Sequence, residues 1–135
     1  MQRRDFLMLT AAVTLVAPMA FAADINIYSP ELVATELAAG KTVVLDFTAS
    51  WCISCQSQGR AIRALRDENP AYDKAITVFD LDWDTYKRTD IANKYGITNR
   101  GSLVFLRGDK VIAQTDTHSP KAELKSLFDQ AAAAA

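Results

Sequence analysis

Residues 46–55 of this 135-residue chain read Asp-Phe-Thr-Ala-Ser-Trp-Cys-Ile-Ser-Cys, and they continue a β-branched, apolar run that begins at Thr42. Such a nearly continuous run predicts a central strand over 42–48 that is covered on both faces, with one acid, Asp46, set into it. The residues after the cysteines have helical periodicity and predict an amphipathic helix that ends near Asn69, before a proline. The two cysteines therefore fall where a buried strand gives way to a helix. The side of this helix expected to face inward carries Ile53, Ala61, Ile62 and Leu65.

Capping and periodicity signals on either side of this segment predict the remaining elements. They are a helix from Ser29-Pro30 to Gly40, a strand over 76–81, a short helix over 89–96 with a Thr89 cap, a hairpin of 103–106 and 111–113, and a last helix opened by Ser119-Pro120 with Leu124, Leu127 and Phe128 inward. The low-complexity stretch 131–135 is expected to fray. This order predicts an α/β fold, a central mixed β-sheet flanked by helices on both faces.

Composition limits the classes of protein that this chain can belong to. Half of the residues are apolar and 23% are charged, which predicts one globular domain. The net charge of -1 and the dispersed Lys and Arg argue against a nucleic-acid partner. The two cysteines lie three positions apart, so a bridge between them closes almost no loop and gives little structural stabilisation.

The first 22 residues have the pattern of a signal peptide. Arg3 and Arg4 are followed by an apolar run over 6–17, and Ala20-Phe21-Ala22 offers a small-x-small cleavage site after Ala22. The apolar run is shorter than the roughly 20 residues that span a bilayer. Because the paired arginines and the following x-Phe-Leu resemble the bacterial twin-arginine signal, we expect export to the periplasm by that route, in the folded state, with the general secretory route as the alternative. The mature domain is then 23–135.

The position of the cysteines assigns them different tasks. A thiol attacks a disulfide as its thiolate, and the start of a helix stabilises that anion, so Cys52 is the expected nucleophile. Cys55 lies one helical turn further on and is the expected resolving thiol. Asp46, if buried, has a raised pKa and can accept the proton of Cys55. The alternative is that Asp46 points to solvent from a partly exposed strand.

The segment Asp46 to Cys55 resembles the active-site segment of thioredoxins, with an acid six residues before the first cysteine and Trp51 directly before it. Tyr95-Gly96-Ile97 and the hairpin segment that follows it are also similar to that family, so the resemblance covers 25–130. It implies a thioredoxin-like fold and dithiol-disulfide exchange on protein disulfides without a cofactor. The segment is also similar to the soluble thioredoxin-like domain of transmembrane disulfide interchange reductases.

Three departures from the family concern the surroundings of the cysteines. The family's cis-proline, which faces the disulfide and holds substrate backbone, falls on Gly101, where a trans peptide is expected. Ile53-Ser54 stands in place of Gly-Pro, and the glycine of the last loop is missing from 114–118. Gly101, Trp51 and Arg100 are the candidate substrate-binding residues. Trp51 can also cover the helix start, with or without a contact to substrate, and Arg100 can meet acidic groups or be an ordinary surface residue.

Other functions stay open at this point. Cys52 and Cys55 are half of a metal or iron-sulfur ligand set, which His118 or a second chain would have to complete, as in a cluster shared across a dimer. A dithiol oxidase and a non-catalytic binding module are further alternatives. We expect a monomeric reductase of protein disulfides that a membrane-bound donor keeps reduced, with no metal and no cofactor.

Overall fold

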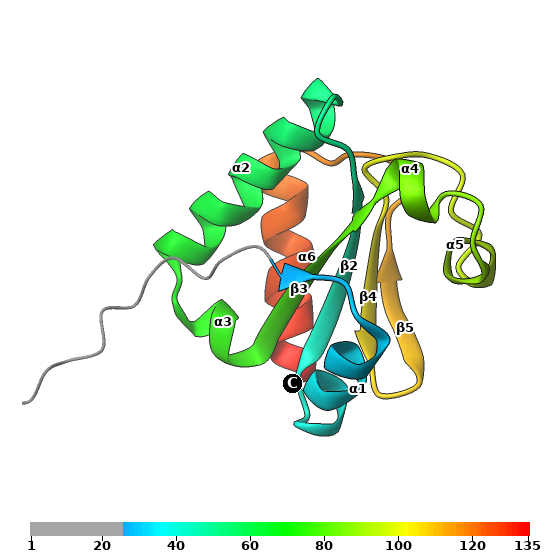
Figure 1. Ribbon diagram of the computed structural model, residues 1–135. Helices are drawn as coiled ribbons and strands as arrows, with labels where there is room; N and C mark the ends of the chain where they lie inside the picture. The colour runs from blue at the N-terminus through cyan, green and yellow to red at the C-terminus, as the bar shows by residue number, and fades with distance from the viewer. Residues whose placement is uncertain (1–25) are drawn as a thin grey trace, which may run out of the picture.

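One mixed β-sheet organises residues 26–135, which are the part of the chain that the computed structural model describes (Figure 1). The predicted signal peptide, 1–22, lies outside these residues. In chain order the elements are β1 (Asn26–Ile27), α1 (Pro30–Ala38), β2 (Thr42–Thr48), α2 (Ile53–Glu68), α3 (Ala71–Ala75), β3 (Ile76–Asp82), α4 (Trp83–Tyr86), α5 (Asp90–Lys94), β4 (Leu103–Arg107), β5 (Lys110–Gln114) and α6 (Lys121–Ala134).

The strands lie in the order β1-β3-β2-β4-β5, so β2 occupies the centre of the sheet. β1 and β2 both run parallel to β3, whereas β4 pairs antiparallel with β2 and β5 antiparallel with β4. Six of the seven residues of β2 are buried, as expected for a strand covered on both faces. The predicted mixed sheet, its central strand and its hairpin are therefore confirmed.

Helices cover both faces of the sheet, and the alternation of side chains along β2 decides what each face contacts (Figure 1). Val44 belongs to the cluster that packs against α2, α3 and α6. Val43 and Leu45 belong to the cluster that packs against α1 and α5. Each buried side chain of this size contributes about 1.5–3 kcal/mol. Asp46 shares the phase of Val44, so it faces α2, the helix that carries the cysteines.

Helix boundaries follow the predicted capping signals in part. Ser29 caps α1, its hydroxyl accepting the Leu32 N–H at 3.4 Å, and Gly40 follows the helix at φ +82°. α2 ends at Glu68 with Asn69 as its C-cap, as predicted, and Pro70 also directly precedes α3. Thr89 occupies the predicted N-cap of α5, but its side chain makes no capping hydrogen bond because its hydroxyl donates to the Tyr86 carbonyl at 2.7 Å.

The C-terminal alanines do not fray as expected. α6 continues to Ala134, and Ala131 is fully buried in the cluster between α6 and the sheet. The buried Thr42 hydroxyl donates to the Ala131 carbonyl at 3.0 Å, which ties the last turn to the start of β2. Ala131 and, in part, Ala132 therefore serve packing, whereas residues 133–135 are exposed.

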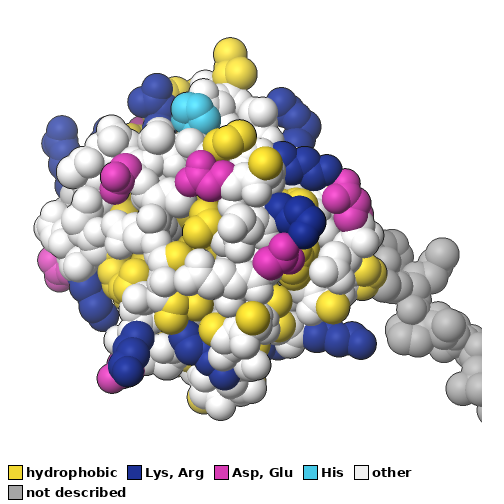
Figure 2. All heavy atoms as spheres, turned by 180° about the vertical axis from the view of Figure 1, so that it is seen from behind, with side chains coloured by type: hydrophobic (Ala, Val, Ile, Leu, Met, Phe, Trp, Pro, Cys, Tyr) yellow, Lys and Arg dark blue, Asp and Glu magenta, His cyan; other side chains and the backbone are white. Residues whose placement is uncertain are grey.

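The surface of the described residues agrees with the charge pattern of the sequence. On the face seen in Figure 2, basic and acidic side chains are interspersed and leave no continuous basic stripe. Within residues 26–135, no helix has the length and apolar character needed to cross a membrane. Ile53, which was expected to face inward, is 85% exposed, because the first residue of α2 projects beyond the end of the sheet.

Candidate active site

Cys52 is the N-cap of α2, which places its sulfur at the positive end of the helix. Its Sγ accepts the backbone N–H of Cys55 at 3.2 Å, one of the donors that a helix start leaves unpaired. Both cysteines are free thiols, Cys52 5% and Cys55 2% exposed. The junction of strand and helix therefore holds both thiols almost fully buried, Cys52 at the start of α2 and Cys55 within its first turn.

The two thiols have opposite shifts in pKa. Burial alone raises the pKa of Cys52, but hydrogen bonds from the Cys55 thiol and backbone and the guanidinium of Arg100 outweigh burial and lower it. Burial, followed by the hydrogen bond to Cys52, raises the pKa of Cys55 to about 11. At neutral pH, Cys52 is thus the better source of thiolate, and Cys55 retains its proton. This difference agrees with the predicted nucleophile and resolving thiol.

Asp46 is buried beside the cysteines rather than pointing to solvent. Its side chain is 4% exposed, and its Oδ1 has no hydrogen-bond partner among the described residues. Together with Cys55 it lines a cavity of about 340 Å³ between α2 and the sheet. Burial and then the charge of Asp80 raise the pKa of Asp46 well above its usual range, and the nearby Gln58 amide acts in the opposite direction. When it is ionised, a buried carboxylate in the cavity of Cys55 can act as the base that accepts the proton of the Cys55 thiol.

Trp51 and Arg100 form a stacked pair next to Cys52. The Arg100 guanidinium lies 4.7 Å from the centre of the Trp51 ring, and the indole N–H donates to Asp84 Oδ2 at 2.7 Å. Trp51 is 54% exposed, so about half of its surface is open to solvent next to Cys52. Arg100 and Cys52 line a second cavity, of about 230 Å³, together with His118.

Gly101 adopts a conformation that its family counterpart, a proline, cannot reach. Its φ is +85°, and a Cβ atom at this position would lie 2.9 Å from the backbone nitrogen of His118. Its N–H donates to the Phe47 carbonyl at 2.6 Å, and its carbonyl accepts the Gln58 amide at 3.0 Å. No peptide bond within 26–135 is cis, in agreement with the expectation for this position. Both polar groups of the Gly101 backbone are therefore used within the protein.

Sequence reasoning missed three residues of this site. Trp83 packs against the cluster of Ala49, Cys52 and Cys55. The buried Gln58 joins α2 to the loop that contains Gly101 and accepts the Ser119 N–H at 2.7 Å. Asp80 lines the cavity of Asp46 and Cys55. The signal for Asp80 was present, because it is an acid inside an apolar strand, as Asp46 is.

Metal ligation finds little support in the arrangement of the described residues. Across 26–135 there is no group of three or more His, Cys, Asp and Glu side chains that could hold a metal ion. His118 lines the cavity of Cys52 without completing such a group.

Comparison with known proteins agrees with this geometry. The family model for thioredoxin matches residues 25–130. Thioredoxin of Chlorobaculum thiosulfatiphilum is 31% identical over 94 residues, which are 70% of this chain and 82% of that protein. Thioredoxin C-2 of Corynebacterium nephridii is 28% identical over 106 residues, 78% of this chain and 94% of that protein.

Solved structures of lower identity support the fold alone. Trxlp from Edwardsiella tarda matches with a TM-score of 0.67 at 22% identity, covering 78% of this chain and 98% of that one. Thioredoxin from Malassezia sympodialis matches with a TM-score of 0.65 at 24% identity, covering 81% and 91%. Fold, family match and cysteine pair lead to the same conclusion: the chain belongs to the thioredoxin family and is a thiol-disulfide oxidoreductase.

Proposed function

We propose that this protein is an exported reductase that transfers two electrons from Cys52 and Cys55 to disulfides of periplasmic proteins. The observation that carries the proposal is the opposite protonation preference of the two thiols, with the buried Asp46 in the cavity of the second one. A reductase needs this division, because one thiol must attack at neutral pH while the other keeps its proton until it resolves the intermediate.

The reaction proceeds by two exchanges at sulfur. The Cys52 thiolate attacks one sulfur of the substrate disulfide, which forms a mixed disulfide and releases the first substrate thiolate. Cys55 Sγ then attacks Cys52 Sγ, which closes the Cys52–Cys55 disulfide and releases the second substrate thiolate. The proton of Cys55 passes to the Asp46 carboxylate and later to solvent. The dithiol loses two electrons, and the substrate disulfide gains two.

Trp51 and Arg100 supply the substrate-facing surface in this proposal. The exposed indole offers an apolar contact beside Cys52, and the guanidinium stacked on it favours an acidic group near the attacked disulfide. The N–H and carbonyl of Gly101 are hydrogen-bonded within the protein. The backbone at this position therefore offers a substrate a different contact from the one that the family proline would support.

Export, a membrane-bound electron donor and a monomeric state complete the proposal. The arginine pair and cleavage pattern in 1–22 support export. Replacing Arg3 and Arg4 together by lysine tests the twin-arginine route. The variant should stay in the cytoplasm of its bacterial host with residues 1–22 attached, and processing equal to that of the unaltered chain would contradict this route.

Insulin reduction with dithiothreitol tests the activity. We expect the mature protein to accelerate reduction and Cys52→Ser to lose all acceleration. Incubated with insulin in the absence of dithiothreitol, Cys55→Ser should instead accumulate a mixed disulfide through Cys52, visible as a mass increase equal to the bound thiol. Ser54→Ala, which changes the residue between the cysteines and leaves both thiols, is the control. A rate unchanged in Cys52→Ser contradicts the proposal.

The direction of electron flow is tested by equilibrating the cysteine pair with glutathione buffers. A potential near the approximately -270 mV of thioredoxin supports reduction. A potential near the approximately -120 mV of strongly oxidising enzymes would make this protein an oxidase.

A further inference from the structure

A second acid, Asp80, lies directly opposite Asp46 on the neighbouring strand. The parallel register of β2 and β3 pairs Asp46 with Asp80, just as it pairs Val44 with Val78 two residues earlier. Paired residues on adjacent strands project from the same face of a sheet. Asp46 and Asp80 line the same cavity as Cys55, beneath α2. The sheet therefore holds two carboxyl groups side by side under the resolving thiol.

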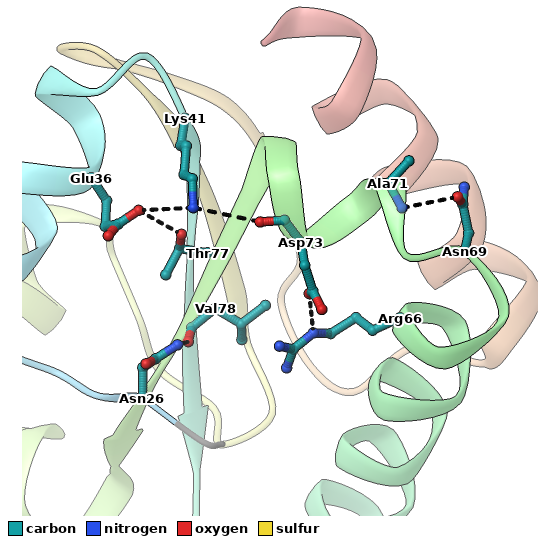
Figure 3. Close-up of polar contacts among 9 residues, drawn as sticks. All are labelled: Asn26, Glu36, Lys41, Arg66, Asn69, Ala71, Asp73, Thr77 and Val78. Carbon is teal, nitrogen blue, oxygen red and sulfur yellow. Dashed lines mark hydrogen bonds and ion pairs between the residues drawn. The ribbon is translucent and has the colours of Figure 1, made fainter. Parts of the chain in front are cut away.

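The charged groups around this pair come from α2 and from β3. Arg63 and Arg66 of α2 line the cavity, and Asp82 of β3 lies at its edge. Both arginines are engaged elsewhere, since Arg63 donates to the Gly59 carbonyl at 3.3 Å and Arg66 binds Asp73 at 2.6 Å (Figure 3).

No ion pair within 26–135 reaches either carboxyl group of the pair. Cys52 and Cys55 are the remaining titratable groups that face Asp46. The β1 residues beside β3, Asn26 and Ile27, carry no titratable side chain.

The environments of the two carboxyl groups determine which one ionises first. Burial raises the pKa of Asp80, and the charges of Arg63 and Arg66 partly offset this rise. Asp46 is buried almost completely, lacks such cations and also experiences the charge of Asp80, so its pKa is raised well above the usual range. Asp80 thus loses its proton first. Neighbouring carboxylates resist double ionisation, so the remaining proton stays on Asp46.

We propose that Asp80 is a positioning residue whose negative charge holds a proton on Asp46 and thereby sets the pH above which Asp46 can accept the proton of Cys55. This inference rests on the proposed reductase reaction, in which Asp46 is the base. Asp80 does not touch the reacting sulfurs in this scheme. It acts only through Asp46, and it makes the resolving step respond to pH.

Carboxyl 13C NMR of the reduced, aspartate-labelled protein tests the coupling without any substrate. In Asp80→Asn, the titration midpoint of Asp46, assigned with Asp46→Asn, should move down by about one pH unit. Asp80→Glu restores the charge and should restore most of the midpoint. Asp67→Asn is the matched control, because it removes one negative charge from the exposed side of α2 and should leave the midpoint unchanged.

Reaction with the disulfide reagent DTNB tests the consequence for the resolving step. Cys52 attacks DTNB and releases one nitrothiobenzoate anion, and Cys55 then attacks the mixed disulfide and releases the second, so the dithiol loses the two electrons that DTNB gains. The rate of the second release should fall as the pH is lowered through the titration of Asp46, and this fall should occur at lower pH in Asp80→Asn than in the unaltered protein. At pH values between the two transitions, the variant should release the second anion severalfold faster than the unaltered protein. Structural damage does not produce such a gain in rate.

The outcomes separate this inference from the proposed function. An Asp46 midpoint that does not move in Asp80→Asn overturns the role of Asp80, whether or not the protein reduces insulin. A midpoint that moves in a protein with no reductase activity retains the coupling and removes the proposed function. A midpoint that moves equally in Asp67→Asn would show a general charge effect and would also overturn the inference.

Discussion

Replacing Gly101 by alanine tests the loop geometry beside Cys52. At φ +85° an L residue costs about 1–2 kcal/mol. The added Cβ would also lie 2.9 Å from the His118 backbone nitrogen, and forcing such an overpacked contact to relax costs about 1–3 kcal/mol more. Gly40→Ala is the matched control, because Gly40 has a φ of +82° and no atom lies within 4 Å of the place that its added methyl group would take.

The difference between the two variants isolates the close contact with His118. With an m value of about 1.5 kcal/mol/M in urea, an extra 1–3 kcal/mol lowers the unfolding midpoint of Gly101→Ala by about 0.7–2 M relative to Gly40→Ala. The measurement is urea unfolding of both reduced proteins, followed by far-UV circular dichroism. Midpoints that agree within about 0.3 M would refute the close packing of Gly101 against the last loop.

Two further predictions concern the charges at the site. Arg100→Ala should raise the pKa of the Cys52 thiol, because a guanidinium that stabilises the thiolate is lost. Alkylation of Cys52 by iodoacetamide at neutral pH should therefore be severalfold slower. In the control Arg88→Ala, at another exposed arginine, Cys52 should be alkylated at the original rate. Asp46→Asn should make the reduced protein more stable at pH 7. The pKa of Asp46 is raised in the folded protein, so folding binds a proton. The free energy of unfolding therefore falls as the pH rises above the pKa of Asp in the unfolded chain, about 3.9. The gain in urea midpoint should vanish near pH 4, and a gain that is equal at both pH values would contradict burial of the ionisable acid as its cause.

The elements that dominate the core could be predicted from the sequence because their signals are local and strong. The strand 42–48 and the start of the first helix at Ser29 match the structure, since β-branched runs and a Ser-Pro start act within a few residues. β1, α3 and α4 were not predicted. These elements of two to five residues lack the glycine that marks the end of the short helix 89–96 and the turn of the hairpin, and their formation depends on the partners they pack against.

In the site, too, local features could be predicted and long-range contacts could not. The different roles of Cys52 and Cys55 follow from one junction of strand and helix, which the local sequence pattern predicts. The pairing of Asp46 with Asp80 depends on which strands become neighbours and in what register, and 34 positions separate the two acids along the chain. The burial of Ala131 likewise depends on its contact with Thr42, 89 positions away.

The placement of Trp51 and Trp83 has an optical consequence. They are the two tryptophans of the chain, one stacked under a guanidinium beside Cys52 and the other packed against the cysteine cluster. The tryptophan fluorescence of the protein therefore originates entirely at its redox centre. Oxidation of the pair and docking on the exposed indole should alter the emission of different rings, so a label-free spectrum can follow both events in one sample.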